Sequence, residues 1–112
     1  MIVLAVVDGL LFQAKIQAAA APLGVEVRIA RTLAQAQDAW SDPAVVIVDL
    51  NLASADPLEV VRALRAQHPA VPIIGYGSHV QTELLAQARA AGCTRVLPRS
   101  AFAHQLPSLL AP

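Results

Sequence analysis

VVIVDLNL, residues 45–52, is the stretch of sequence that decides the fold. It opens with four consecutive β-branched residues, which is typical of a strand buried on both faces of a parallel sheet. The run ends at Asp49, and a carboxylate directly after a buried strand is costly unless it is paired or solvated. The stretch therefore predicts a central strand with a carboxylate at its carboxyl end.

Short apolar runs and helical patterns alternate on both sides of this stretch. The sequence predicts strands over 2–7, 25–30, 44–48, 72–76 and 94–97, and helices over 10–21, 33–40, 57–67 and from a Ser78 cap to residue 91. The third of these helices has the clearest start, because Asp56 offers an N-cap and is followed by proline and a capping-box glutamate. Pro107 interrupts the tail from Ser100, which predicts a short or broken last helix.

Alternating strands and helices with short connections predict an α/β fold, in which helices cover both faces of a parallel sheet. In segment 25–30 aliphatic residues alternate with Glu26 and Arg28, as expected of an edge strand with one wetter face. With right-handed crossovers, we expect a flavodoxin-like three-layer sandwich with strand order 2-1-3-4-5. The 112 residues fit one domain, predicted over 1–112.

Composition excludes several classes of partner. Eight basic residues balance eight acidic ones without a basic run, so neither nucleic acid nor a membrane is expected as a direct partner. No segment is long and uncharged enough to span a bilayer, and Asp8 interrupts the apolar start, which argues against a secretory signal. The single cysteine, Cys93, excludes an internal disulfide and suits a reducing compartment, so we expect a cytoplasmic protein.

The candidate site lies where two strands end. Ligands of such folds bind beyond the carboxyl ends of the strands, where the strand order reverses. Asp8 and Asp49 end the first and third predicted strands, and two carboxylates there suit Mg²⁺ or a nucleophilic role. Asp8 is equally well explained as the N-cap of the first helix. Asp49 favours a site role over an incidental position, because its helix begins only after Asp56.

At these residues the chain resembles the receiver domains of response regulators, in the CheY-like superfamily. Segment 45–52 resembles the strand that carries the phosphoacceptor, which places Asp49 at that position. Segments 72–79 and 92–99 resemble the family's fourth strand and the approach to its invariant lysine. The resemblance covers nearly the whole chain and implies a part in two-component signalling or a phosphorelay.

Two departures from the family weaken the expected phosphoryl chemistry. The family has two adjacent acids after the first strand, whereas Asp8 is followed by Gly9, which lowers the charge offered to Mg²⁺. The hydroxyl residue that ends the family's fourth strand is replaced by Gly77. Ser78 supplies a hydroxyl only if the backbone bends toward the site, and we favour its interpretation as a helix cap.

Two more departures concern the switch. Val96 stands at the family's switch aromatic and Arg99 at its lysine. A guanidinium can grip a carboxylate with two hydrogen bonds, so we hypothesise a fixed ion pair between Arg99 and Asp49. A solvated arginine in a loop is the alternative.

These features predict a non-enzymatic pseudo-receiver of bacterial signal transduction, with an impaired phospho-switch and no cofactor beyond weakly held Mg²⁺. Its partner would be a protein or a second copy, bound through the fourth helix, the fifth strand and the tail. The apolar residues there are Leu84, Leu85, Val96, Phe102, Leu106, Leu109 and Leu110, for most of which ordinary core positions are the alternative.

Two other functions stay open. The first is a working receiver that a histidine kinase phosphorylates on Asp49, with at most residual autophosphorylation or dephosphorylation as its own chemistry. The second is a small-ligand-binding flavodoxin-like domain, for which the sequence has no glycine-rich phosphate loop. The remaining residues with chemical potential receive ordinary roles: His68, His79 and His104 as histidines without metal-ligand spacing, Cys93 as a buried thiol, and Trp40 and Tyr76 as core aromatics.

Overall fold

All five predicted strands pair in one parallel sheet, in the order β2-β1-β3-β4-β5 that the sequence predicts. This computed structural model describes residues 1–111, so the last residue of the predicted 1–112 domain lies outside it. The strands are β1 (Ile2–Val6), β2 (Glu26–Ala30), β3 (Val45–Asp49), β4 (Ile73–Gly77) and β5 (Arg95–Pro98). The helices are α1 (Leu10–Ala20), α2 (Leu33–Asp38), α3 (Pro57–Gln67), α4 (Thr82–Ala91) and α5 (Arg99–Leu110).

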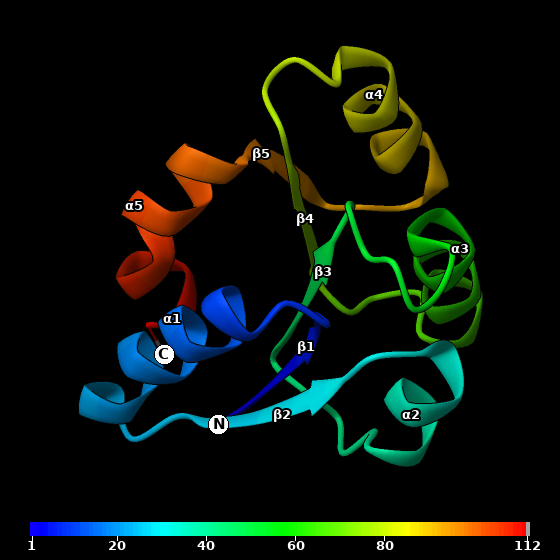
Figure 1. Ribbon diagram of the computed structural model, residues 1–112. Coiled ribbons are helices and arrows are strands. Elements are labelled where there is room, and N and C mark those ends of the chain that lie inside the picture. The colour runs from blue at the N-terminus through cyan, green and yellow to red at the C-terminus, as the bar shows by residue number, and fades with distance from the viewer. Residues whose placement is uncertain (112) are drawn as a thin grey trace.

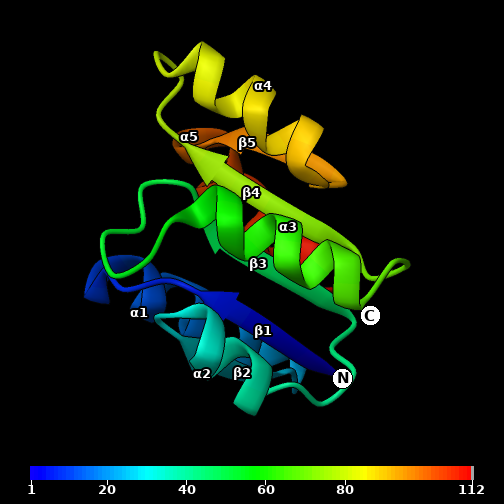
Figure 2. The same ribbon diagram turned by 90° about the vertical axis from the view of Figure 1, so that its right-hand side faces the viewer.

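The sheet separates two layers of helices. Figure 1 shows α1 and α5 on one face and α2, α3 and α4 on the other, and Figure 2 shows α2, α3 and α4 in front of the strands. Successive residues of β3 serve opposite layers: Val46 and Val48 join the cluster under α3, and Val45 and Ile47 join the cluster under α1 and α5. A strand buried on both faces explains the uninterrupted apolar run in the sequence.

Side-chain caps start two of the helices where the sequence predicts them. The Thr32 hydroxyl accepts a hydrogen bond from the Gln35 N–H at the start of α2. The Asp56 carboxylate accepts from the N–H groups of Leu58 and Glu59 at the start of α3. Such caps satisfy amides that have no partner inside the helix.

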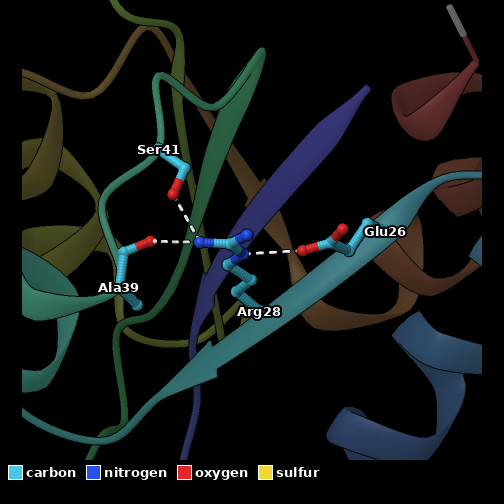
Figure 3. Close-up of polar contacts among 4 residues, drawn as sticks. All are labelled: Glu26, Arg28, Ala39 and Ser41. Carbon is cyan, nitrogen blue, oxygen red and sulfur yellow. Dashed lines mark hydrogen bonds and ion pairs between the residues drawn. The ribbon is translucent and has the colours of Figure 1, made fainter.

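The strand predicted to lie at the edge of the sheet does so. β2 pairs only with β1 among the described residues, and Arg28 ties it to the α2–β3 connection (Figure 3). The Arg28 guanidinium contacts the Glu26 carboxylate at 2.7 Å, donates to the Ala39 carbonyl at 3.4 Å and also contacts the Ser41 hydroxyl. Both charged side chains are partly exposed, so solvent screens their ion pair.

The expectation of a short or broken last helix is wrong. α5 runs for 12 residues and contains Pro107. Proline removes one backbone hydrogen bond and costs a helix interior about 3 kcal/mol. Phe102, Leu106 and Leu110 recur at four-residue spacing and are all buried, so their packing under the sheet outweighs that cost. No helix within residues 1–111 has the length and apolar character needed to cross a bilayer.

Candidate functional site

The carboxyl ends of β1, β3 and β4 converge at one edge of the sheet, and the loops that follow them form the candidate site. Asp49 is the last residue of β3 and lies in register with Tyr76 of β4. Asp8 follows β1, whose last residue, Val6, is in register with Val48. The structure thus brings the two predicted carboxylates to the same end of the sheet, as parallel strands require.

Asp8 neither caps α1 nor points away from the site. Its Oδ2 accepts hydrogen bonds from the N–H groups of Ala53 and Ser54, both at 2.9 Å. Desolvation raises the pKa of Asp8, but hydrogen bonds led by those from Ser54 and Ala53 outweigh it, so the pKa is lowered. The N-cap interpretation is therefore wrong: Gly9 is the N-cap residue of α1, without a side-chain hydrogen bond, and Asp8 instead fastens the β3–α3 loop.

Asp49 is half-buried, and its surroundings disfavour the ionised form of its carboxyl group. Desolvation by burial raises its pKa, while the Asn51 N–H, which donates to Oδ1 at 2.8 Å, and the charge of Arg99 oppose that rise without cancelling it. Asp8 adds a repulsion of like charges. A carboxylate that is costly to ionise where it stands is typical of a site residue, although ion-pair networks also perturb pKa values.

The predicted ion pair between Arg99 and Asp49 is not formed. Within residues 1–111 the only ion pair joins Arg28 to Glu26. Arg99 Nη2 instead donates to Asn51 Oδ1 at 2.6 Å, because Asn51 stands between the arginine and the carboxylate in the hydrogen-bond chain. The arginine therefore acts on Asp49 only through space, lowering its pKa against the effect of burial.

Two residues that the sequence interpretation missed, Asn51 and Gln81, complete this arrangement. Asn51 Nδ2 donates to Gln81 Oε1 at 2.9 Å, and the same oxygen accepts from the Ser78 N–H at 3.1 Å. We call this chain of contacts, Arg99–Asn51–Gln81–Ser78 N–H, the loop clasp. It joins the loops after β3 and β4 to the first residue of α5. The one available signal was the position of Asn51, two residues after Asp49.

Gly77 and Val96, which stand at the family's switch positions, contribute no polar side chain to the site, and Ser78 contributes its N–H to the loop clasp. Gly77 ends β4, and Val96 is buried at 7% exposure in β5. Ser78 does not cap α4, which begins only at Thr82 after Gln81 as N-cap residue. Its hydroxyl accepts from the Val80 N–H at 3.4 Å and so stabilises the turn before the helix. The Ser78 cap is thus a wrong prediction, since the serine lies one turn too early.

Tyr76 is a second missed neighbour of Asp49. Its ring is fully buried between Phe12 and Phe102, with ring centroids 5.0 and 4.2 Å away. Its hydroxyl is close enough to Asp49 for each group to influence the pKa of the other, yet it makes no hydrogen bond of normal geometry. Desolvation and then the Asp49 charge raise the pKa of Tyr76, so the phenol stays neutral.

Three other candidates, Cys93, His79 and His68, lie outside the loop clasp. Cys93 is buried, and burial raises the pKa of its thiol to about 11, which makes it unreactive at neutral pH. His79 is exposed in the β4–α4 loop. His68 stacks on Trp40 with ring centroids 3.5 Å apart. The described part of the chain contains no group of three or more histidine, cysteine or acidic side chains placed to hold a metal ion.

Most of the apolar residues named on α4, β5 and the tail are core residues, which is the alternative that the sequence left open for them. All seven are buried or only partly exposed, because they fill the spaces between these helices and the sheet. The strongly exposed large apolar residues lie elsewhere: Leu10 at 77%, Leu11 at 66% and Val80 at 72% exposure. These three lie at the start of α1 and in the β4–α4 loop, at the site end of the molecule.

Solved structures of receiver domains share this architecture. The receiver domain of NtrX from Brucella abortus is 22% identical, with a TM-score of 0.84 over 97% of this chain and 93% of that one. The phosphorylated cyanobacterial phytochrome response regulator RcpA is 20% identical, with a TM-score of 0.80 over 97% and 87%. A longer NtrX chain from the same bacterium is 22% identical with a TM-score of 0.86, and the present chain spans only 25% of its length.

No family model and no curated protein sequence matches the chain. Its structural neighbours are response-regulator receiver domains, and its fold is the flavodoxin-like fold of those domains. The fold predicted from the pattern of strands and helices is therefore confirmed.

Proposed function

We propose that the chain is a pseudo-receiver: a non-enzymatic, cytoplasmic protein-interaction module of bacterial signal transduction whose site loops are held together without phosphate. The observation that carries the proposal is the loop clasp. Arg99, Asn51 and Gln81 connect the ends of three α/β units through hydrogen bonds of 2.6 and 2.9 Å. In a working receiver, the resemblance implies, a phosphoryl group on the aspartate makes that connection.

The switch side chains support the same proposal. The resemblance implies that phosphate biases a two-state equilibrium through a hydroxyl on the fourth strand and an aromatic on the fifth. Gly77 has no side chain to follow the phosphate, and Val96 is already packed in the core. A ligand at Asp49 would therefore have little difference in affinity between two states to exploit, and without that difference no equilibrium shifts.

The site offers Mg²⁺ few of the oxygen ligands that the ion prefers. Mg²⁺ prefers six oxygen ligands in octahedral geometry and usually keeps several waters. Only Asp8 and Asp49 offer carboxylates, and one oxygen of Asp8 already accepts two amide N–H groups. We propose that Mg²⁺ is bound weakly through these two carboxylates and is not required for the interaction function.

The position of Asp49 favours one alternative, a working phosphoacceptor. This carboxylate ends the central strand, and the unpaired charge of Arg99 lies close enough to lower its pKa. The same charge would stabilise phosphate on Asp49 if a histidine kinase delivered it. The two functions are distinguishable, because a phosphoryl group on Asp49 would compete with Asn51 for the Arg99 guanidinium and so would break the clasp.

Under the favoured proposal the partner is a protein, either a second copy or another signalling component. The exposed leucines at the start of α1 and Val80 in the β4–α4 loop offer it apolar side chains at the site end of the molecule.

Amide NMR with Mg²⁺ and beryllofluoride, which mimics phosphorylated aspartate, tests the proposal. We expect shifts confined to residues near Asp49, with α4 and β5 unchanged. A variant with Gly77→Thr and Arg99→Lys is the matched comparison, because it returns two family side chains to the same backbone. Wild-type shifts that spread through α4 to Val96 would show a working switch and overturn the proposal.

A further inference from the structure

A cavity of about 500 Å³ lies beside the Asp49 site, between α1, the β4–α4 loop and the start of α5. Its walls include Phe12 and Lys15 of α1, His79 of the loop, and Arg99 and Ser100 of α5. The volume falls within the range of about 300–1,000 Å³ typical of small-molecule sites. Neither predicted carboxylate of the site lines this cavity, so it is a space distinct from the phosphoacceptor crevice.

The charges around the cavity are of one sign. Lys15 and Arg99 are cations, and no acidic side chain is part of the lining. Neither Lys15 nor Arg99 forms an ion pair in the part of the chain that the structure describes. The Arg99 hydrogen bond goes to a neutral amide, and Asp49 interacts with the arginine only through space. Unpaired cations in a concave surface concentrate anions near it.

The first turn of α5 adds to this positive potential. α5 begins at Arg99, its N-cap residue is Pro98, and neither a capping side chain nor an acidic residue occupies its first turn. The N–H groups at the start of a helix have no partners within it, and the helix dipole favours an anion there. Because Arg99 and Ser100 also line the cavity, the helix start and the two cations act on the same space.

The remaining wall is apolar and rigid. The Phe12 ring stacks on Tyr76 with centroids 5.0 Å apart and lies 6.2 Å from Phe102, so packing fixes its orientation. The Lys15 ammonium lies 5.3 Å from the centre of the same ring, which places charge and apolar surface side by side. Leu11, 66% exposed, extends the apolar surface at the rim.

We propose that this cavity binds a small organic anion, with a phosphate or carboxylate head group and an apolar body. The head group lies between Lys15, Arg99 and the first turn of α5, and the apolar body lies against Phe12 and Leu11. Binding requires neither Mg²⁺ nor phosphate on Asp49, so the site is independent of the proposed pseudo-receiver function. Because Arg99 also belongs to the loop clasp, an anion bound in the cavity contacts a residue that orders the site loops.

Phenyl phosphate is a suitable probe, because it combines a phosphate group with an apolar ring. In amide NMR titrations without Mg²⁺, we expect saturable shifts at Phe12, His79 and Ser100, with a Kd of about 1 mM or lower. Phenol lacks the charge and inorganic phosphate lacks the ring, so each should bind more weakly than phenyl phosphate. Absence of saturable shifts with phenyl phosphate up to about 10 mM would overturn the proposal.

Charge variants locate the binding site. Lys15→Gln should weaken phenyl phosphate binding about fivefold, whereas Arg62→Gln, an exposed arginine on the opposite face, should leave it unchanged. Ser100→Asp, which places an acid in the first turn of α5, should abolish it. Asp49→Asn removes a negative charge that acts on Arg99, so it should bind the probe at least as tightly as the wild type. Binding lost in Asp49→Asn but kept in Lys15→Gln would assign the probe to the phosphoacceptor crevice and contradict the proposal.

Discussion

The Arg99 guanidinium contacts the side chain of Asn51, 2.6 Å away, and within residues 1–111 the neighbouring carboxylate of Asp49 forms no ion pair. The arginine therefore performs a structural task that needs neither a metal nor a phosphoryl group. Asn51 transmits the contact to Gln81, so that three loops at the carboxyl edge of the sheet hold one another in place. This relationship underlies the proposed function and gives the first prediction.

Asn51→Ala removes both hydrogen bonds of the Asn51 side chain at once. We expect it to lower the free energy of unfolding by about 1 kcal/mol, because each partly exposed hydrogen bond contributes about 0.5–1 kcal/mol. Residues 78–81 should exchange their amide hydrogens faster, as Gln81 loses its partner. Hydrogen exchange read by mass spectrometry checks this, with the exposed Gln37→Ala of α2 as control. Unchanged exchange over 78–81 would show that the clasp does not order the loop.

Asp49→Asn should stabilise the protein at neutral pH. The pKa of Asp49 is raised in the folded state, so the folded protein holds the proton more tightly and loses stability as pH rises from about 4. The amide carries no charge and avoids that loss. We expect the variant to melt several degrees higher at pH 7, since about 1 kcal/mol corresponds to roughly 4–8 °C in a domain near this size. The difference should vanish toward pH 3, and a lower Tm at pH 7 would contradict it.

Asp8→Asn should have the opposite effect. Hydrogen bonds from Ser54 and Ala53 outweigh desolvation and lower the pKa of Asp8, so its stabilising contribution is present at neutral pH and is lost as pH falls below about 4. Replacing the carboxylate at pH 7 should cost about 1 kcal/mol, a value reduced from that of a buried charged pair because solvent reaches the group. Urea unfolding at pH 7 and pH 3 measures it. A cost that persists at pH 3 would show that shape, rather than charge, is responsible.

Gly77→Ala should be tolerated, whereas Gly92→Ala should not. A Cβ at Gly77 would meet Leu85 Cδ2 at 3.4 Å, an ordinary contact, and would remove the entropic cost of glycine in a strand, stabilising by about 0.5 kcal/mol. A Cβ at Gly92 would lie 2.8 Å from Arg65 Cγ at a φ of 130°, which should cost roughly 1–3 kcal/mol. Thermal unfolding of the two variants decides the matter, and equal Tm values would refute the argument.

The sheet was predictable because its signals are local. The β-branched run at residues 45–48 and the alternating pattern of β2 identify centre and edge of the sheet without any tertiary information. α5 was mispredicted because Pro107 is a local signal, while the burial that overrides it depends on the sheet beneath.

The site was predictable in its location but not in its contacts. Asp8 and Asp49 mark strand ends, which topology alone brings together. The partners of Asp8 are backbone amides of Ala53 and Ser54, 45 and 46 residues away, which no side-chain pattern announces. The contact between Asn51 and Gln81, 30 residues apart, likewise follows from no pattern in the sequence. The resemblance drew attention to Arg99 and Asp49 as a pair, and the intervening asparagine became visible only in three dimensions.

Trp40, which stacks on His68, and Tyr76, which stacks on Phe12 in the core, can each serve as a spectroscopic probe of unfolding. The chain has a single tryptophan and a single tyrosine. Trp40 packs against the cluster under α2, α3 and α4, and Tyr76 belongs to the cluster under α1 and α5. Trp40 fluorescence, excited at wavelengths that tyrosine does not absorb, therefore reports on one side of the sheet, and the ring NMR signals of Tyr76 report on the other. Coincident denaturation curves from the two rings would mean that both layers melt as one cooperative unit, and separate curves would mean that they melt independently.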